Sequence, residues 1–209
     1  MSVPVVPVPQ PDALTRLYGR AVMGPYLDAA LVAASESGAR VAVFFVDLDD
    51  VKEFNSQYGF VAGDEALRVI AHRLDHRAGP DRQVTRFGGT DFVIVDPASR
   101  NRAEVVLLAH QVLHAVRAPF TEVELMTHAA AIAGRSITCS VGIGLSSPGI
   151  TGDELLRQAN EAMYSAKWWS RGVRRGSSYT VFDDRPPPWQ AGTEQRSSGT
   201  DRPPATEPG

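Results

Sequence analysis

Residues 86–95, RFGGTDFVIV, are the most informative part of the chain for its fold. Two adjacent glycines stand before a strongly apolar run, a pattern typical of the tip of a β-hairpin. Because glycine has no Cβ, the backbone of such a tip can approach a ligand closely. Thr90 and Asp91 follow the glycines. The stretch therefore predicts a hairpin that presents backbone and one carboxylate to a site.

A second run, residues 40–49, reads RVAVFFVDLD and is almost continuously apolar until its end. Such a run predicts a strand that is buried on both faces. Three acids, Asp47, Asp49 and Asp50, lie together at its end, where burial is costly unless something neutralises them. Strand alternation places Asp47 and Asp49 on one side.

Two interpretations of these acids stay open at this point. They either bind a hard cation such as Mg²⁺, which takes carboxylates together with substrate phosphates, or they cap the next helix. If the hairpin lies beside this strand, its tip faces Asp47. Acids from adjacent strands, two metal ions and a triphosphate make up the two-metal arrangement for phosphoryl and nucleotidyl transfer.

The remaining elements follow from hydrophobic periodicity and turn residues. Their order, α-β-α-α-β-β-α-β-α-β, predicts an α/β (α+β) domain in which helices pack on a mixed sheet. Asp12 is expected to cap the first helix, and Thr151 with Glu154 to form a capping box for the last. The predicted helices are 12–37, 50–58, 64–76, 101–117 and 151–168, and the predicted strands are 40–49, 83–86, 91–96, 136–145 and 178–182.

Composition excludes several classes of function. The chain has 209 residues, 43% of them hydrophobic and 22% charged, as in a globular domain, and a formal net charge of -3. This charge gives no general attraction to nucleic acid or to a membrane surface, and no apolar run is long enough to span a bilayer. Without a signal-peptide pattern, a cytoplasmic location is expected. The lone Cys139 excludes a disulfide within the chain and is expected to be a buried thiol.

Proline marks the ends of the domain. Ten of the fifteen prolines lie in the first eleven residues or after Asp184. Segments rich in Pro, Gly and Ser with few apolar residues are typical of disorder. We therefore expect disordered ends at 1–11 and 184–209 and an ordered domain over 12–183.

Five motifs in register resemble the diguanylate cyclase (GGDEF) domain family. They are DALTRLYGR from Asp12, VDLDDVKEFNSQYGFVAGDEALRVIAHRL from Val46, RFGGTDFVIV, CSVGIG from Cys139 and LLRQANEAMYSAKWWSRG from Leu155. The resemblance covers residues 12 to 182. It implies a palm-like fold with a central, mostly antiparallel sheet flanked by helices, also found in nucleotide polymerases and class III nucleotidyl cyclases.

The resemblance also implies a role for particular residues. Those implied to hold Mg²⁺ are Asp47, the carbonyl of Leu48 and, as a further candidate, Asp91. Those implied to bind GTP are Asn55 and Asp64 at the guanine and Lys52, Lys167 and Arg171 at the phosphates. The chain has 21 basic residues and only two are lysine, so both lysines fall on phosphate positions.

The signature itself departs from the family. Gly-Gly-[Asp/Glu]-Glu-Phe reads Gly88-Gly89-Thr90-Asp91-Phe92, so a threonine replaces the acid that binds metal. The hydroxyl is neutral, and Asp91 is one methylene shorter than the glutamate that assists catalysis. Smaller departures are Ser56, Phe60, Asn160 and Ser170, and the product-inhibition positions hold Gly79 and Arg82.

Three hypotheses about function remain. The first is a degenerate GGDEF domain that binds GTP or a related guanine nucleotide with little or no turnover and signals through a protein partner or a homodimer. The second is an active cyclase with an atypical signature, using Asp47 and Asp91. The third is an interaction module that binds no nucleotide. A transition-metal site at the helical pairs His72/His76 and His110/His114 is disfavoured, because neither pair has an evident third ligand.

Overall fold

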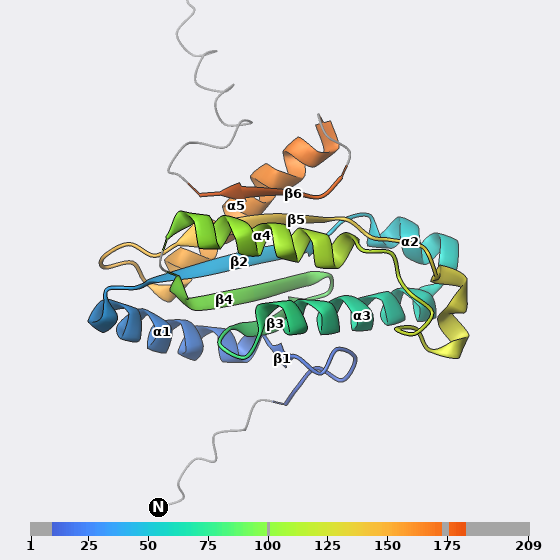
Figure 1. Ribbon diagram of the computed structural model, residues 1–209, viewed down its shortest axis with the longest axis horizontal. Coiled ribbons are helices and arrows are strands. Elements are labelled where there is room, and N and C mark those ends of the chain that lie inside the picture. Colours follow the sequence, from blue (N-terminus) through green and yellow to red (C-terminus); the bar gives the residue numbers. More distant parts are fainter. Residues whose placement is uncertain (1–9, 100, 173–175, 183–209) are drawn as a thin grey trace, which may run out of the picture.

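Six strands form the central sheet of the described chain, in the order β1-β3-β4-β2-β5-β6. The computed structural model describes residues 10–99, 101–172 and 176–182 (Figure 1). The outer pairs β1–β3 and β5–β6 are parallel and the central pairs are antiparallel, so the predicted mixed, mostly antiparallel sheet is confirmed. The strands are β1 (Tyr18–Gly19), β2 (Arg40–Leu48), β3 (Gln83–Gly88), β4 (Asp91–Ser99), β5 (Cys139–Leu145) and β6 (Ser178–Val181).

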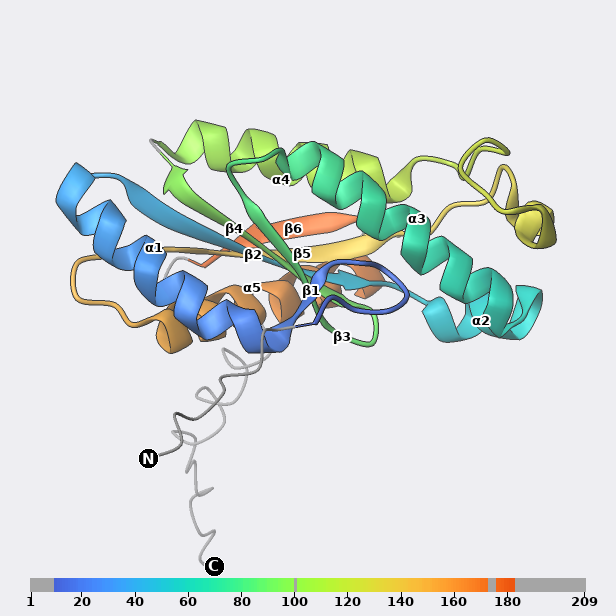
Figure 2. The ribbon, with the colours of Figure 1, turned by 90° about the horizontal axis from the view of Figure 1, so that it is seen from below.

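The sheet lies between two layers of helices, as Figure 2 shows from below. Strand β2 is at the centre, and it is buried along its whole length after Arg40, as its apolar sequence predicts. Phe44 and Val46 point to the α3 and α4 side, whereas Val43 and Phe45 point to the α1 and α5 side. The helices are α1 (Met23–Ser37), α2 (Val51–Tyr58), α3 (Phe60–Ala78), α4 (Arg102–Arg117) and α5 (Gly152–Gly172), with 3-10 helices η1 (Arg20–Val22) and η2 (Thr127–Ile132).

The segment before α1 corrects one prediction. The helix expected from Asp12 begins only at Met23. Instead, the Asp12 carboxylate accepts hydrogen bonds from the N–H and the hydroxyl of Thr15, at 2.8 and 2.7 Å, and closes a turn. Pro25 explains the difference, because proline fits the first turn of a helix and breaks its interior. The residues Tyr18–Gly19, which precede α1, form the short strand β1 instead.

The boundary between α2 and α3 is narrower than predicted. Only Gly59, with φ of 86°, interrupts the two helices, and α3 begins at Phe60. A Cβ on Gly63 would lie 1.8 Å from Oδ1 of Asn55, so glycine is what allows α3 to approach α2 here. This close approach places Asn55 directly beside the first turn of α3.

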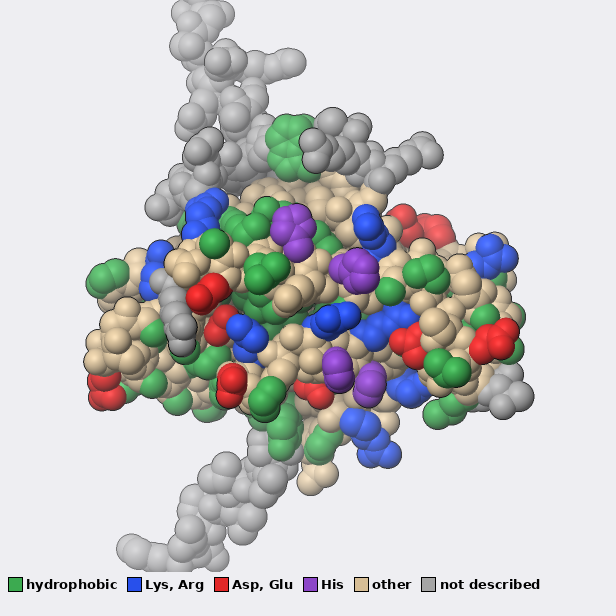
Figure 3. Space-filling view, viewed as in Figure 1, with side chains coloured by type: hydrophobic (Ala, Val, Ile, Leu, Met, Phe, Trp, Pro, Cys, Tyr) green, Lys and Arg blue, Asp and Glu red, His purple; other side chains and the backbone are tan. Residues whose placement is uncertain are grey.

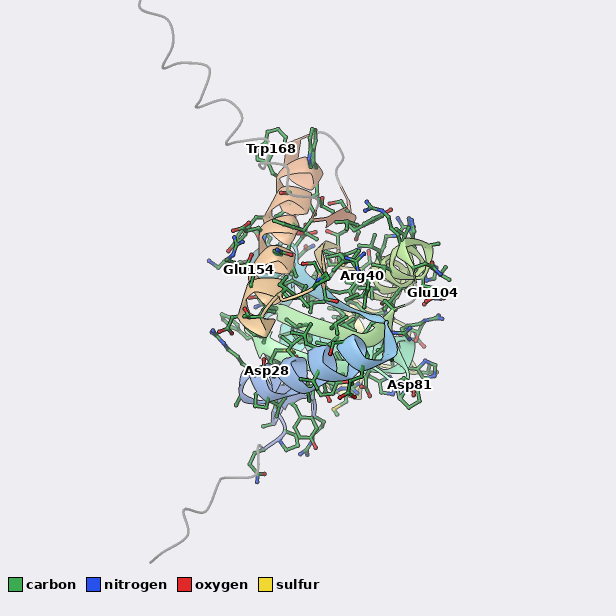
Figure 4. All side chains as sticks on the ribbon, turned by 90° about the vertical axis from the view of Figure 1, so that its left-hand side faces the viewer. Asp28, Arg40, Asp81, Glu104, Glu154 and Trp168 are labelled. Atoms are coloured by element: carbon green, nitrogen blue, oxygen red, sulfur yellow. The ribbon has the colours of Figure 1, made fainter. Side chains whose placement is uncertain are left out.

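Helix α5 covers the β5 end of the sheet. The hydroxyl of Thr151 accepts the N–H of Glu154 at 3.2 Å, which is half of the predicted capping box. The Glu154 carboxylate pairs with Arg157 instead of returning to the cap. Figure 4 shows α5 along one side of the sheet, with Trp168 near the end opposite Glu154. Lys167, the residue before Trp168, belongs to the site described below.

Other predictions about the surface can be judged directly. Cys139 is fully buried, as expected. Histidine and arginine side chains are gathered over α3 and α4 in Figure 3, and His72, His76, His110 and His114 are all exposed. Among the described helices, none combines the length and the apolar character that crossing a bilayer requires. The segments 1–9 and 183–209 lie outside the described residues.

Candidate functional site

The site lies where β2 and β4 meet the hairpin tip. Asp47 is directly opposite Asp91 on β4 and directly opposite Ser140 on β5. Because directly opposed residues on antiparallel strands point to the same face, these three side chains share one face of the sheet. The tip that joins β3 to β4 contains Gly89 with φ of 48°, and its backbone is exposed. The hairpin thus lies beside β2, which is the condition under which its tip faces Asp47.

The side chain of Thr90 contacts Asp47. Its hydroxyl lies 3.4 Å from Oδ1 of Asp47, and its carbonyl accepts the N–H of Leu48 at 3.3 Å. A hydroxyl in this place donates to the carboxylate and adds no negative charge. Thr90 therefore occupies an oxygen of Asp47 and supplies no acid of its own.

Lys167 occupies the second oxygen of Asp47. It reaches across from α5, and its ammonium forms an ion pair with Oδ2. The two side chains are 20% and 10% exposed, so water screens this pair only in part. Both carboxylate oxygens of Asp47 thus have a partner from this chain.

Asp49 is a member of the site that the roles carried over from the family omit. Its two oxygens accept the hydroxyls of Thr138 at 2.9 Å and of Ser140 at 3.1 Å. Burial raises the pKa of Asp49 against the effect of these hydrogen bonds and of Lys167, and Asp47 raises it further. Its spacing from Asp47 was the available signal, because residues two apart share a side of a strand.

Asp91 is the carboxylate that the signature retains. Burial raises its pKa to about 6, repulsion from Asp47 acts in the same direction, and Lys167 opposes both. The chain thus brings three carboxylates, Asp47, Asp49 and Asp91, around one ammonium.

A groove lies next to the first turn of α3. Its volume is about 610 Å³, and Asp64 on α3 lines it together with residues 13–17, Arg68 and Met126. Asn55 lies behind Gly63, the neighbour of Asp64, and its Oδ1 is buried without a hydrogen-bond partner among the described residues. A buried unpaired amide oxygen costs about 1–3 kcal/mol, so a ligand donor at this point would be favourable.

The remaining predicted site residues lie on α2, β2 and α5. Lys52 is exposed near the start of α2, the helix that carries Asn55. Leu48 ends β2 beside Asp47 and is almost fully buried. Arg171 lies on α5 one turn after Lys167, and its side chain is outside the described part of the structure.

The donor set fits one magnesium ion in part. Asp47 and the carbonyl of Leu48 are hard oxygen ligands, and Mg²⁺ usually binds through one or two carboxylates plus substrate phosphates and water. Over residues 10–99, 101–172 and 176–182, no cluster of three or more His, Cys, Asp or Glu side chains could hold a metal by itself. An ion that arrives with phosphate oxygens therefore fits these residues better than an ion held by protein ligands alone.

Comparisons with known proteins agree with this geometry. The model of the diguanylate cyclase GGDEF domain matches residues 10–172. Diguanylate cyclase TpbB of Pseudomonas aeruginosa is 32% identical over 167 residues, which cover 78% of this chain and 36% of that protein. Response regulator PleD of Caulobacter vibrioides is 31% identical over 169 residues, covering 80% of this chain and 36% of that protein. This chain thus spans about a third of these relatives.

Solved structures give the same answer. The structure of an N-terminally truncated mutant of TpbB from Pseudomonas aeruginosa, comprising only the GGDEF domain, superposes with a TM-score of 0.73 at 29% identity, covering 83% of this chain and 95% of that one. The GGDEF domain of DgcB from Caulobacter crescentus, solved in complex with c-di-GMP, gives a TM-score of 0.68 at 26% identity, with coverage of 85% and 98%. The sheet order, the hairpin beside Asp47 and these matches lead to one conclusion: the chain belongs to the diguanylate cyclase GGDEF domain family.

Proposed function

We propose that this chain is a degenerate GGDEF domain of cyclic di-GMP signalling that binds GTP or a related guanine nucleotide with little or no turnover. The observation that carries the proposal is Asn55, whose buried Oδ1 has no partner among the described residues. It lies against Gly63, the sequence neighbour of Asp64, and Asp64 lines the groove beside α3.

Guanine suits this pair of side chains. Its Watson–Crick edge presents an N–H and an amino group as donors and a carbonyl as acceptor. The Asp64 carboxylate accepts two hydrogen bonds, and the Asn55 amide both accepts and donates. Adenine presents a ring acceptor where guanine presents the N–H, so it would leave an acceptor of the pair unsatisfied. We therefore expect the site to prefer GTP over ATP.

The phosphates would extend toward Asp47. Lys52, Lys167 and Arg171 are the cations proposed to contact them, and a lysine ammonium is a compact charge suited to a triphosphate. Magnesium belongs to the proposal as the ion that accompanies the phosphates, held by Asp47 and the carbonyl of Leu48. Bound there, Mg²⁺ would neutralise phosphate charge.

Low turnover follows from Thr90. Where the family places a carboxylate beside the metal, this hydroxyl donates toward Asp47. A well-placed charge contributes several kcal/mol to a charged transition state, so its loss lowers the rate by roughly two to four orders of magnitude.

One observation favours a second candidate, an active cyclase. Asp91 lies directly across from Asp47 and retains a carboxylate on the metal face. In this case Asp91 would serve the metal in place of the missing acid. Cyclic di-GMP joins two GTP molecules, so this activity needs a second copy of the domain. In the degenerate domain, by contrast, a protein partner or a second copy would receive the signal.

One experiment separates these candidates. GTP and ATP binding are measured by calorimetry with Mg²⁺, and cyclic di-GMP is quantified by chromatography in the same samples. We expect GTP to bind, ATP to bind more weakly, and product to be scarce. Product formed at rates typical of cyclases would favour the second candidate. No GTP binding at millimolar concentration would favour the third hypothesis, an interaction module that binds no nucleotide.

Restoring the signature tests the assignment of Thr90. The double substitution Thr90→Glu with Asp91→Glu returns the family's acids to both positions. We expect residual cyclase activity to rise, and magnesium to strengthen GTP binding by roughly tenfold more than in the unmodified chain. An unchanged effect of magnesium in this variant would show that the metal position is assigned wrongly.

A further inference from the structure

The ion pair between Lys167 and Asp47 joins two residues with different implied partners. Asp47 is the proposed ligand of a cation and Lys167 the proposed ligand of a phosphate, yet here they bind each other. Lys167 also opposes the rise in pKa that burial causes at Asp49 and Asp91. The ammonium is therefore paired with Asp47, at the oxygen that a cation would bind.

The backbone that carries Lys167 is held firmly. A Cβ on Gly142 of β5 would lie 2.0 Å from the carbonyl oxygen of Ala159 and from the amide nitrogen of Met163, so α5 and β5 are in close backbone contact one turn before Lys167. The hydroxyl of Ser178 on β6 also donates to the carbonyl of Ala166 at 2.8 Å. Any change of partner by Lys167 is therefore a movement of its flexible side chain, because α5 itself is fixed.

Competition between the two cations follows from charge. A divalent ion can bind Asp47 only if the ammonium leaves, since two cations on one partly buried carboxylate repel each other. The ammonium leaves readily only if another anion receives it. A nucleotide phosphate is such an anion, and it also supplies the oxygen ligands that the protein lacks.

We propose that Lys167 is a built-in counter-ion that keeps Asp47 closed to divalent cations until a nucleotide phosphate draws its ammonium away. The nucleotide-free protein then binds divalent cations weakly, and cation and nucleotide bind cooperatively. The phosphate half of this inference rests on the proposed nucleotide binding, and the cation half rests on the proposal that Asp47 binds a divalent cation.

The test measures Mn²⁺ binding to the nucleotide-free protein, using electron paramagnetic resonance of free Mn²⁺. Lys167→Met removes the ammonium and leaves three carboxylates without it, so we expect Mn²⁺ affinity to rise at least about tenfold. Lys167→Arg keeps the charge and should stay as weak as the unmodified protein. Arg117→Met, which removes an exposed positive charge from α4 on the other side of the sheet, controls for net charge.

Two further variants keep the test decisive. Adding Asp47→Asn to Lys167→Met should abolish the gain, and a gain that persists would place the ion elsewhere and overturn the inference. Lys167→Gln replaces Lys167→Met if the latter fails to fold, as judged by circular dichroism. Mn²⁺ affinity within twofold of the unmodified protein in the folded variant would also overturn the inference.

Nucleotide titrations separate this inference from the proposed function. In the unmodified protein, GTP should raise Mn²⁺ affinity, and Lys167→Met should lower GTP affinity while it raises Mn²⁺ affinity. If the unmodified protein binds no GTP, the proposed function fails, and the Mn²⁺ comparison still decides whether Lys167 closes Asp47. If GTP binds but leaves Mn²⁺ affinity unchanged, the cooperative half of the inference is overturned.

Discussion

Single atoms decide what the site can bind. The Thr90 hydroxyl lies at 3.4 Å from Asp47, and the Lys167 ammonium takes the other carboxylate oxygen. Oδ1 of Asn55, in contrast, is buried and has no partner among the described residues. Asp47, the proposed metal ligand, is thus paired within the chain, whereas Asn55, the proposed guanine ligand, has an unused acceptor.

Asn55→Ala tests the role of that acceptor. Because Oδ1 is buried and makes no hydrogen bond among the described residues, its loss should not lower the free energy of unfolding. GTP affinity should fall roughly tenfold or more, since a ligand donor loses its acceptor. Calorimetry and urea unfolding measure the two quantities.

Gln57→Ala is the matched control for this change, because Gln57 is exposed on the same helix. It should alter neither GTP affinity nor stability. The idea would fail if Asn55→Ala destabilised the protein and left GTP affinity unchanged, which would make Asn55 a purely structural residue.

At the scale of elements, close packing places the site residues. Gly63 lets α3 approach α2 and places Asn55 against the first turn of α3. Gly142 and Gly144 let α5 lie close to β5, and Lys167 of α5 reaches the end of β2. In both places, the absence of a side chain on glycine allows two elements to come into close contact.

Gly142→Ala tests the packing of α5. The added Cβ would lie 2.0 Å from backbone atoms of Ala159 and Met163, which cannot rotate away as a side chain could. We expect α5 to be displaced and the free energy of unfolding to fall by about 3 kcal/mol. Thermal and urea unfolding measure the loss.

Gly19→Ala provides the control for a methyl group alone. Gly19 has an extended backbone with φ of -85°, and a Cβ there has no atom within 4 Å. This variant should match the unmodified protein within about 0.5 kcal/mol. Equal stability of Gly142→Ala and Gly19→Ala would show that α5 adjusts to the methyl group without loss.

For the whole molecule, one ion pair joins α3 to the segment after α4. Arg73 donates two hydrogen bonds of 2.7 Å to the Glu124 carboxylate and further ones to the carbonyls of Ala115, Ala118 and Pro119. These hydrogen bonds from Arg73, followed by those from Thr121, hold the pKa of Glu124 at about 2, against its usual 4.5.

The pH dependence of stability follows from this lowered pKa. The contribution of Glu124 is complete above pH 4.5 and is lost as the pH falls from about 4.5 to about 2. With partial exposure considered, Glu124→Gln should lower the free energy of unfolding at pH 7 by about 1–2 kcal/mol. The variant should also lose less stability than the unmodified protein between pH 4.5 and 2, as measured by urea unfolding.

Glu122→Gln is the matched control, since it removes an exposed charge from the same segment. Its stability should follow that of the unmodified protein at every pH. If Glu124→Gln and Glu122→Gln gave the same curve, the ion pair with Arg73 would contribute nothing to acid stability.

The amino-acid sequence was enough to predict the buried strand β2, the hairpin, most helices and the family. These features follow from local hydrophobic periodicity and from short motifs, both of which can be recognised without knowledge of tertiary contacts. It did not predict β1, because two residues become a strand only when β3 lies beside them. The sequence also did not predict the turn at Asp12. The Asp12 carboxylate accepts a hydrogen bond from the N–H of Thr15 and forms an ion pair with Arg86 at 2.9 Å.

The pairing of the site residues depends on contacts between elements that are far apart in the sequence. Lys167 and Asp47 are 120 positions apart, and both were assigned to ligands from the sequence, yet they bind each other. Asp49 accepts hydrogen bonds from Thr138 and Ser140, and Oδ1 of Asn55 is buried without a hydrogen-bond partner among the described residues. Charge pairing and burial depend on distances in space. Local sequence patterns therefore identify the candidate residues of a site, whereas the packing of α5, β5 and α3 determines which residues these contact.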